Sequence, residues 1–393
     1  MGLEVPKGYK FGVYAGGLRY KGRDDLTLVL SETPAAAAGV FTQNRFKAAP
    51  VVVARDILGK GPVRALLINS GQANACTGPR GISDCRDCLR ILARELNIRE
   101  QEILPASTGV IGQHLPMHLM ERVLPCLADG VGKSSPPDAA RAIMTTDKFP
   151  KMATGSVRFG GGTVRILGLA KGAGMISPDM ATMLGFILCD AEVDGDLWQE
   201  LLGRVVQRSF NSITVDGDTS TNDCVLALAN GASGVRVEET DLDTFSREIL
   251  RVCQELSYQI VQDAEGGTKV LHISVSGASD APQAEAAARA VGNSPLVKTA
   301  LYGNDPNWGR IVAALGRSGA DFDPEKVRVI LGEYCIFENG CPAEEDVDAV
   351  FARFLSGTDV YLKVELGQGP GEYELKASDL SHEYVSINAE YRT

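Results

Sequence analysis

The chain has 393 residues, a net charge of −11 and a pI near 5.0. This acidic balance argues against broad binding to nucleic acid or to an anionic membrane surface, because both need a basic face. Apolar residues make up 44% and charged residues 23%, so a sizeable core is available. The length favours two to three domain-sized units, or one large domain divided into lobes.

The cysteines and the N-terminus indicate the compartment. The nine cysteines are odd in number and most lie in apolar runs, which favours reduced thiols over a disulfide framework. Cys85 and Cys88 form a CxxC without a second pair at zinc-ribbon spacing, so a helical interpretation is preferred to a metal site. The first residues lack the apolar core of a signal peptide, and the apolar runs are too short to span a membrane. We expect a cytoplasmic protein, or one of an organelle matrix if a transit peptide has been removed.

Short β-prone runs bounded by Gly, Pro or Asn predict strands in the first third of the chain. These expected strands cover residues 10–15, 26–31, 36–42 and 63–69. Apolar residues at helical spacing then predict helices at 83–97, with Ser83 as the cap, and at about 117–129 and 137–144. Two further strands are expected at 153–158 and 163–169, joined across the glycines at 160–162.

An irregular Gly-rich stretch follows, and an apolar strand is expected directly after it at 183–189. Helices are expected at about 195–210, 243–264, 281–291 and 345–355, and strands at 224–229, 269–276, 327–331, 359–365, 371–376 and 383–388. Because strands and helices come in blocks, the pattern predicts an α+β fold rather than a doubly wound parallel sheet. The stretch 130–137, within the sequence GVGKSSPPD (130–138), is the best candidate for a linker because of its composition.

The Gly-rich stretch ends in the small residue Ala181, and Thr182 then heads the apolar strand. A Thr, Ser or Cys at the head of a strand, after a crowded loop, is the arrangement of N-terminal nucleophile enzymes. Its hydroxyl can attack the preceding carbonyl, convert the peptide into an ester and let water open it. The freed α-amino group, with a reference pKa of about 7.7–8.0, can then accept the hydroxyl proton near neutral pH.

The same stretch is also compatible with a plain structural loop, in which Thr182 is only a strand residue. Gly172 and Gly174 permit backbone angles that other residues resist. A phosphate-binding loop is excluded, because no Gly-Lys-Ser/Thr closes the loop before a helix and no GxGxxG follows a strand.

Eight motifs in order decide between these interpretations, and together they resemble the ornithine acetyltransferase family, bifunctional glutamate N-acetyltransferases of the cyclic arginine pathway. The resemblance runs from about residue 5 to the C-terminus. The motifs are INSGQANACTG (68–78), PASTGVIG (105–112), MTTD (144–147), KGAGMISPDMATML (171–184), VDGDTSTND (215–223), DAEGGTK (263–269), GNDPNWGR (303–310) and INAEYRT (387–393).

The resemblance implies roles for the residues that carry the chemistry. Thr182 is expected to be the nucleophile, which takes the acetyl group from N2-acetylornithine and passes it to L-glutamate in ping-pong order. Thr108 and Gly109 match the oxyanion-hole pair, one supplying a hydroxyl and the other a backbone N–H. Without the family context, Ser-Thr-Gly is as well explained by a simple turn.

The resemblance also implies a set of substrate-binding residues. They are Thr145, Lys171, Thr182, Glu265, Asn388 and Thr393. A cation suits substrates that carry a carboxylate, and Glu265 could pair with an ammonium of ornithine or orient the entering amine. Taken singly, Lys171 and Glu265 would more often be solvated surface groups. A contact from Thr393 requires the tail to fold back over the site, since tails are usually disordered unless they are tied down.

Two motifs have no assigned chemistry. The aspartates of VDGDTSTND could suggest a cation loop, but they do not follow the spacing of an EF-hand, which is therefore excluded. We interpret VDGDTSTND and DPNWGR as structural turns that shape the pocket.

The family further implies self-cleavage between Ala181 and Thr182 into an α chain (1–181) and a β chain (182–393), which pack into one αβ unit. It implies a layered α/β/β/α sandwich related to the aminopeptidases, an α2β2 assembly, no metal or cofactor, and acetyl-CoA as an alternative donor. Two other functions stay open: an amidase or aminopeptidase, in which water resolves the acyl-threonine, and a non-catalytic amino-acid-binding protein that never cleaves.

Overall fold

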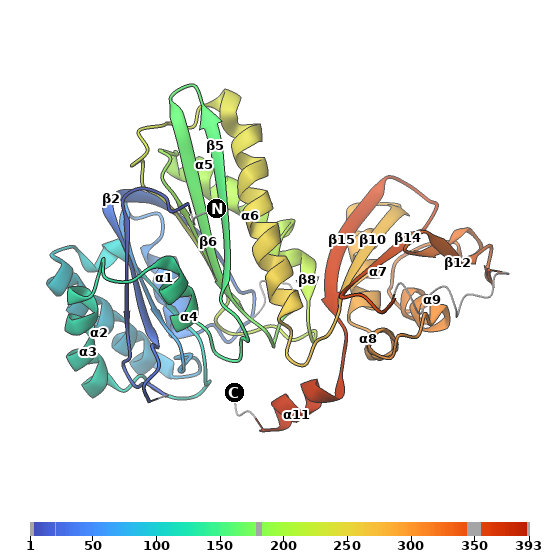
Figure 1. The fold of residues 1–393 in the computed structure, drawn as a ribbon, viewed down its shortest axis with the longest axis horizontal. Coiled ribbons are helices and arrows are strands. Elements are labelled where there is room, and N and C mark those ends of the chain that lie inside the picture. The colour runs from blue at the N-terminus through green and yellow to red at the C-terminus, as the bar shows by residue number, and fades with distance from the viewer. Residues whose placement is uncertain (1–3, 20, 178–182, 344–354, 391–393) are drawn as a thin grey trace.

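The computed structural model describes residues 4–19, 21–177, 183–343 and 355–390, and it divides into two lobes (Figure 1). The first lobe contains an eight-stranded sheet with the path β4-β3-β2-β9-β7-β6-β5, in which β1 also pairs with β2. Its strands are β1 (Tyr9–Tyr14), β2 (Leu26–Phe41), β3 (Val63–Asn69), β4 (Ile103–Ser107), β5 (Lys151–Phe159), β6 (Gly162–Lys171), β7 (Leu184–Cys189) and β9 (Cys224–Ala229).

The long strand β2 folds this sheet into two layers. Its first half pairs with β1 and β3, and its second half, from Ala36 to Phe41, pairs with β9. Leu167, Phe186 and Leu226, on the inner faces of β6, β7 and β9, share one core with residues of β2 and β3. The alternate residues of the same strands face a second core, because successive side chains of a strand point to opposite sides.

Helices cover both outer faces of this sandwich. The helices α1 to α4 contact β1, β2, β4, β5 and β6, whereas Trp198 of α5 and Phe245 of α6 lie in the second core. The result is an α/β/β/α layered fold, as expected. The helices are α1 (Ala49–Ile57), α2 (Gly78–Leu96), α3 (Met117–Asp129), α4 (Pro136–Ala142), α5 (Gly195–Gln207) and α6 (Leu242–Gln262).

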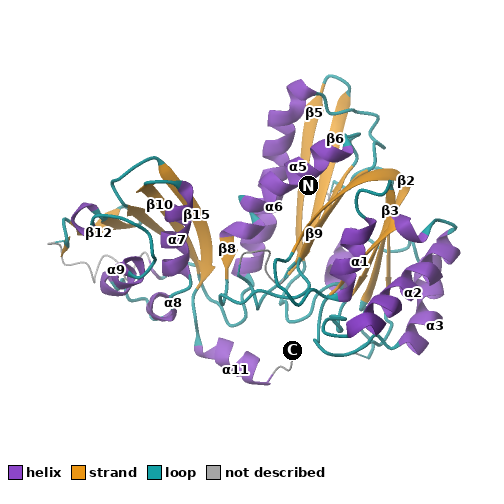
Figure 2. Cartoon of the chain, turned by 180° about the vertical axis from the view of Figure 1, so that it is seen from behind, coloured by secondary structure: helices purple, strands orange, loops and turns teal. Residues whose placement is uncertain are grey.

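The second lobe is a seven-stranded sheet, β13-β12-β11-β14-β10-β15-β8, with helices on one face (Figure 2). Its strands are β8 (Ile213–Thr214), β10 (Val270–Ala278), β11 (Arg328–Leu331), β12 (Tyr334–Glu338), β13 (Cys341–Pro342), β14 (Asp359–Glu365) and β15 (Gly371–Ser378). Its helices are α7 (Ala281–Gly292), α8 (Pro295–Tyr302) and α9 (Trp308–Gly316).

The chain then leaves β15 and forms α11 (His382–Glu390), which stands apart from both sheets and reaches back beneath the first lobe (Figures 1 and 2). The strand expected at 383–388 is therefore wrong. Ser381 accepts a hydrogen bond from the backbone N–H of Tyr384 at 3.3 Å in the first turn of this helix. A helix satisfies its own backbone, so a segment with no sheet beside it favours this form over a strand.

Two other expectations also need correction, and a third cannot be compared with the described residues. The strands expected at 26–31 and 36–42 are one strand, β2, which bends where it changes partners. Residues 130–137 are no domain boundary, because Ser134 bridges to Phe11 of β1 inside the first lobe. The helix expected at 345–355 falls almost wholly outside the described residues.

Candidate active site

A pocket opens where loops from one end of the sandwich meet α11, with an empty volume of about 740 Å³ including its mouth. Six of the residues singled out in the sequence line it together: Thr108, Gly109, Thr145, Lys171, Glu265 and Asn388. The other residues at its wall are Ile111, Thr146, Gly174, Met175, Asp216, Asp218, Ser220, Asn222 and Tyr384. Ala181, Thr182 and Thr393 lie outside the described residues.

Thr108 and Gly109 follow β4 in a tight loop at the pocket wall. The loop is held because Thr108 N–H donates to the carbonyl of Asn69 at 3.0 Å and Val110 N–H donates to that of Gly71 at 3.2 Å. Gly109 has φ +131°, and a Cβ atom there would lie 2.2 Å from the carbonyl carbon of Gly71, so only glycine fits. Within the described residues, neither the Thr108 hydroxyl nor the Gly109 N–H makes a hydrogen bond, which leaves both donors for a ligand.

Buried amide side chains brace this loop from behind. The Asn69 amide donates to the Gln72 carbonyl at 2.8 Å, and the Ser107 hydroxyl donates to Asn69 Oδ1 at 2.6 Å. The Asn222 amide donates to the carbonyls of Ala73 and Ser107, at 2.6 and 2.8 Å. The motifs INSGQANACTG and VDGDTSTND therefore meet beneath the pocket. A role for INSGQANACTG at the pocket was not predicted. The feature that could have indicated it is the run of amide and hydroxyl residues directly after a buried strand.

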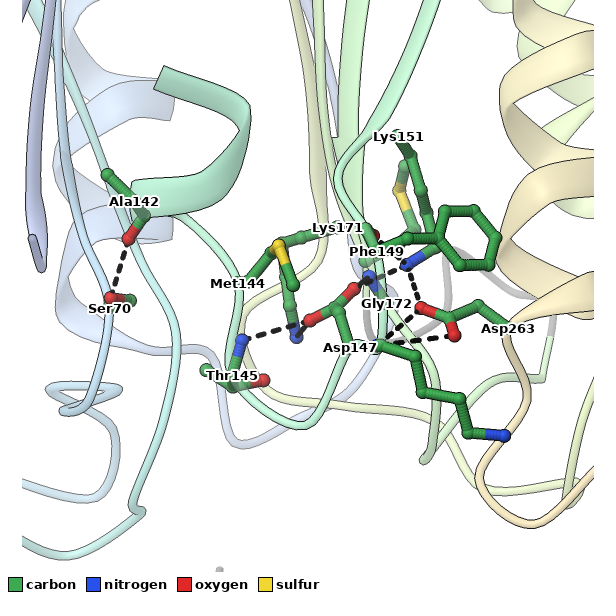
Figure 3. Close-up of polar contacts among 12 residues, drawn as sticks. Ser70, Ala142, Met144, Thr145, Asp147, Phe149, Lys151, Lys171, Gly172 and Asp263 are labelled. Carbon is green, nitrogen blue, oxygen red and sulfur yellow. Dashed lines mark hydrogen bonds and ion pairs between the residues drawn. The ribbon is translucent and has the colours of Figure 1, made fainter. Parts of the chain in front are cut away.

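Lys171 ends β6 and is buried, with its side chain 4% exposed, so the solvated alternative does not hold. Its ammonium lies 3.9 Å from Asp147 Oδ2 and makes no hydrogen bond within the described residues. Asp147 Oδ2 also accepts the backbone N–H of Thr145 at 2.9 Å (Figure 3). Burial alone would raise the pKa of Asp147, but the ammonium groups of Lys171 and Lys151 outweigh it and hold that pKa well below its usual range.

Acidic residues form another part of the pocket wall. Glu265 is 8% exposed, and its carboxylate accepts a hydrogen bond from the Asn388 amide at 2.9 Å. Its backbone N–H donates to Ala173 at 2.9 Å, which fixes it beside the loop after β6. Asp216 and Asp218 complete this wall. Burial raises the pKa of Asp216, although backbone N–H groups that donate to it act in the opposite direction.

The loop between Lys171 and Leu184 connects two antiparallel neighbours, since these two residues are partners in the pairing of β6 with β7. Asp216 accepts the backbone N–H groups of Met175 and Ile176, at 2.6 and 2.8 Å. Met175 has φ +56°, a conformation that a residue with a side chain rarely adopts. The described part of this loop is therefore fixed in a strained form.

Asp223 anchors the other end of the loop. It is fully buried, and its Oδ1 accepts the backbone N–H of Met183 at 2.9 Å. Burial raises the pKa of Asp223 well above its usual value, with partial relief from the Lys171 ammonium. The residue that follows Thr182 is thus held in place.

The two glycines of KGAG serve different purposes. Gly172 has φ +153°, a backbone angle that favours glycine, as expected. Gly174 has no such angle, but a Cβ atom on it would lie 2.3 Å from a Glu265 carboxylate oxygen. This close approach, rather than a special angle, explains the second glycine.

The DPNWGR motif (305–310) does not belong to this pocket. It precedes and begins α9 in the second lobe, where Asn307 caps the helix by accepting the N–H of Arg310. None of its residues lines the pocket between the lobes, so the expectation that this motif shapes the pocket is wrong.

Neither a metal cluster nor a membrane-spanning helix is evident in the described part of the chain. No group of three His, Cys, Asp or Glu side chains there is arranged to hold a metal ion, and Cys85 and Cys88 are buried on α2. None of the described helices combines the length and the apolar character that crossing a membrane requires.

Comparisons with known proteins give a consistent result. The model of the ArgJ family matches residues 10–393. The chain is 55% identical, over 99% of both chains, to the arginine biosynthesis bifunctional protein ArgJ of Nitratidesulfovibrio vulgaris, and 45% identical, over 100% of this chain and 97% of the other, to that of a Synechococcus strain. A crystal structure of the Bacillus halodurans bifunctional protein ArgJ shares 36% identity with a TM-score of 0.52, covering 53% of this chain and 100% of that chain.

Proposed function

This chain belongs to the ArgJ family, and from that premise we propose that it is a bifunctional enzyme of arginine biosynthesis that transfers an acetyl group from N2-acetylornithine to L-glutamate. In this proposal Thr182 carries the acetyl group as an ester between the two half-reactions. The enzyme is a glutamate N-acetyltransferase, with amino-acid acetyltransferase activity as its second function and acetyl-CoA as the second donor.

One observation carries the proposal: the pocket joins two unused hydrogen-bond donors, a buried cation and an acidic wall at the loop that contains Thr182. The Thr108 hydroxyl and the Gly109 N–H are the donors, and Lys171 is the cation. Donors held in advance at the place where negative charge develops are the main requirement for acyl transfer.

In the first half-reaction, the Thr182 hydroxyl attacks the acetyl carbonyl of the donor, and its proton passes to the free α-amino group of the same residue. Thr108 and Gly109 stabilise the oxyanion of the tetrahedral intermediate. The intermediate collapses when the C–N bond breaks and the leaving amine of ornithine takes the proton. The amine of glutamate then attacks the acetyl-threonine ester and reverses these steps.

The charges of the pocket match both amino acids. Lys171 suits the α-carboxylate that the donor and the acceptor share, since a nearly desolvated ammonium with free N–H groups binds a carboxylate strongly. Glu265 lines the same pocket and suits the side-chain ammonium of N2-acetylornithine. Asn388 and Thr393 would close the site from the tail, and Thr145 would contact the substrate beside Lys171.

Self-cleavage between Ala181 and Thr182 supplies the free α-amino group. The strained Met175 and the anchored Met183, on either side of the bond, support this proposal. The solved Bacillus halodurans chain has about half the length of this one, the size that such a cut leaves. We further propose an α2β2 assembly of the fragments 1–181 and 182–393 in the cytoplasm.

The test is intact-mass spectrometry of the purified protein beside a Thr182→Ala variant, combined with an assay of acetyl transfer between N2-acetylornithine and glutamate. The proposal requires two fragments that part between Ala181 and Thr182, and neither cleavage nor transfer in the variant. Acetate release without N-acetylglutamate would favour the hydrolase alternative. An uncut, inactive wild-type chain that still binds ornithine would favour the binding-protein alternative.

A further inference from the structure

A second lysine lies beside Lys171, and it is buried completely. Lys151, at the start of β5, is 0% exposed, and its ammonium lies 2.7 Å from Asp147 Oδ1 and 2.5 Å from Asp263 Oδ2 (Figure 3). A buried ion pair is weak evidence for stability, because the loss of hydration offsets much of the attraction. The proposed reaction has not used this lysine, so its place next to the pocket calls for another role.

Asp147 is the common partner of this group, and its carboxylate is already occupied on both oxygens. Oδ1 accepts the Lys151 ammonium and the backbone N–H of Gly172, both at 2.7 Å. Oδ2 accepts the backbone N–H of Thr145 at 2.9 Å. Lys171 is left at 3.9 Å from Oδ2, which is too long for a hydrogen bond. The carboxylate therefore attracts the Lys171 ammonium without occupying its N–H groups.

We propose that Asp147 and Lys151 are positioning residues that hold Lys171 and Thr145 ready for the carboxylate of an amino-acid substrate. Asp147 fixes the backbone on both sides of the pocket wall, at Thr145 and at Gly172, and attracts the Lys171 side chain. Lys151 binds Oδ1 of Asp147 and so shares the negative charge of that carboxylate, which weakens its attraction for Lys171 on the side of Oδ2. This inference rests on the proposed function only in the choice of ligand.

The charge balance explains why two lysines are needed. With Lys151 in place, two buried lysines serve the buried aspartates Asp147 and Asp263, and Lys171 is the one that the pocket exposes to a ligand. Asp223 is also buried near Lys171, but burial raises its pKa well above the usual value, which favours its neutral form. Without Lys151, Asp147 would have Lys171 as its nearest ammonium among the described residues, and the two would close to a direct pair. A paired Lys171 would bind a substrate carboxylate poorly, because it would have to break that pair first.

The test compares Lys151→Met, Asp147→Asn and the double variant with the wild type. Calorimetric titration gives the affinity for ornithine and for glutamate, the transfer assay gives KM and kcat, and thermal unfolding gives Tm. For each single variant we expect a loss of affinity and a rise in KM of about 10- to 100-fold, the range for one charge-assisted hydrogen bond. The kcat at saturation should change by less than about threefold if only binding is affected.

The double variant separates positioning from structure. Removing one member of a buried pair destabilises strongly, whereas replacing both members restores stability. We expect the double variant to recover only part of the lost Tm, because Asp263 still lacks its ammonium partner, and to recover no affinity, because Lys171 and Thr145 have lost their support. Recovery of affinity together with Tm would overturn the inference, as would a fall in kcat with KM unchanged.

Asp190→Asn is the matched control. Asp190 is also 0% exposed and also accepts backbone N–H groups, those of Arg165 and Lys7, but it lies at the far end of β7. The same substitution there should lower Tm and leave KM unchanged, and an equal rise in KM would overturn the inference. If the wild type binds ornithine but transfers no acetyl group, the proposed function fails while the affinity comparison still decides this inference.

Discussion

The two lobes differ in how the faces of their sheets are covered. In the first lobe both faces of the sheet are covered, and alternate residues of β6, β7 and β9 belong to two separate cores. In the second lobe the helices α7, α8 and α9 cover one face, while the other carries His272, Lys363 and the 60% exposed Tyr361. Thr108, Gly109 and Lys171 come from the ends of strands in the enclosed sheet, and the second lobe contributes the tail that carries α11. Packing on both faces of a sheet holds the ends of its strands in place, and acyl transfer requires catalytic groups that are held in place.

The largest effect on turnover is expected at the enclosed sheet. Thr108→Val removes the hydroxyl that we propose stabilises the oxyanion and keeps the shape of the side chain, so kcat should fall about 100- to 1000-fold with KM nearly unchanged. Thr108→Ser retains the hydroxyl and should recover most of the rate. Steady-state kinetics with N2-acetylornithine and glutamate measure both, and an unchanged kcat in the valine variant would remove Thr108 from the mechanism.

Glu265 lies where the two lobes meet, and we expect a smaller effect there. Glu265→Gln keeps an acceptor for the Asn388 amide but loses the negative charge. The KM for N2-acetylornithine should rise about 10- to 100-fold, because a hydrogen bond to a charged group is lost. The KM for glutamate, which has no side-chain ammonium, should rise less. Equal increases for both substrates would show that Glu265 does not distinguish them.

The tail should contribute less than either wall. Asn388→Ala removes the 2.9 Å hydrogen bond from α11 to Glu265, and we expect KM to rise about tenfold or less, the worth of a single hydrogen bond. Ser386→Ala, on the same helix but outside the pocket, is the control and should leave KM unchanged. A rise in KM as large as that expected for Glu265→Gln would mean that the tail holds the other residues of the site in place, rather than only adding one contact to it.

The smallest effect on turnover is expected inside the second lobe, at Lys298. This lysine is 4% exposed and its ammonium bonds to Ser378, and burial lowers its pKa to about 8. The unfolded chain, with a lysine pKa near 10.5, binds the extra proton between these values, so the free energy of unfolding rises with pH by about 3 kcal/mol across that window.

Thermal unfolding at pH 7.5 and pH 10 tests this, with Lys298→Met as the comparison. The variant should lose the rise in stability of the second lobe and keep its kcat. If the difference in Tm between the two proteins does not change with pH, the ammonium is not the cause.

Much of the fold could be predicted because apolar runs bounded by turn residues define strands. The expected strands 63–69, 224–229 and 359–365 agree with β3, β9 and β14 in both bounds. The prediction for the end of the chain was wrong. The sequence EYVSIN alternates like a strand, whereas the helix α11 that it forms buries no residue against a core. Where no core selects a face, periodicity does not decide between helix and strand.

The candidate site, like the fold, could be predicted only in part. Thr108, Lys171 and Glu265 were foreseen from motifs, and the structure brings them to one pocket, while their roles stay predictions. Asp147 and Lys151 were not foreseen, because their importance lies in contacts that only the fold creates, such as that of Lys151 with Asp263, more than a hundred residues away in the chain. A sequence shows that a lysine is present but not that it is buried between two carboxylates.

The order of strands in the first sheet has a further consequence. The strands β7 and β9 lie between β2 and β6, so the residues before the proposed cut and those after it alternate within one sheet. Residues 1–181 alone would lack the two central strands, β9 and β7, of the sheet that they form. Residues 1–181 and 182–393 therefore have to fold as one chain before the proposed cut. That cut would supply both fragments from one gene and in equal number, so that neither fragment would lack its counterpart.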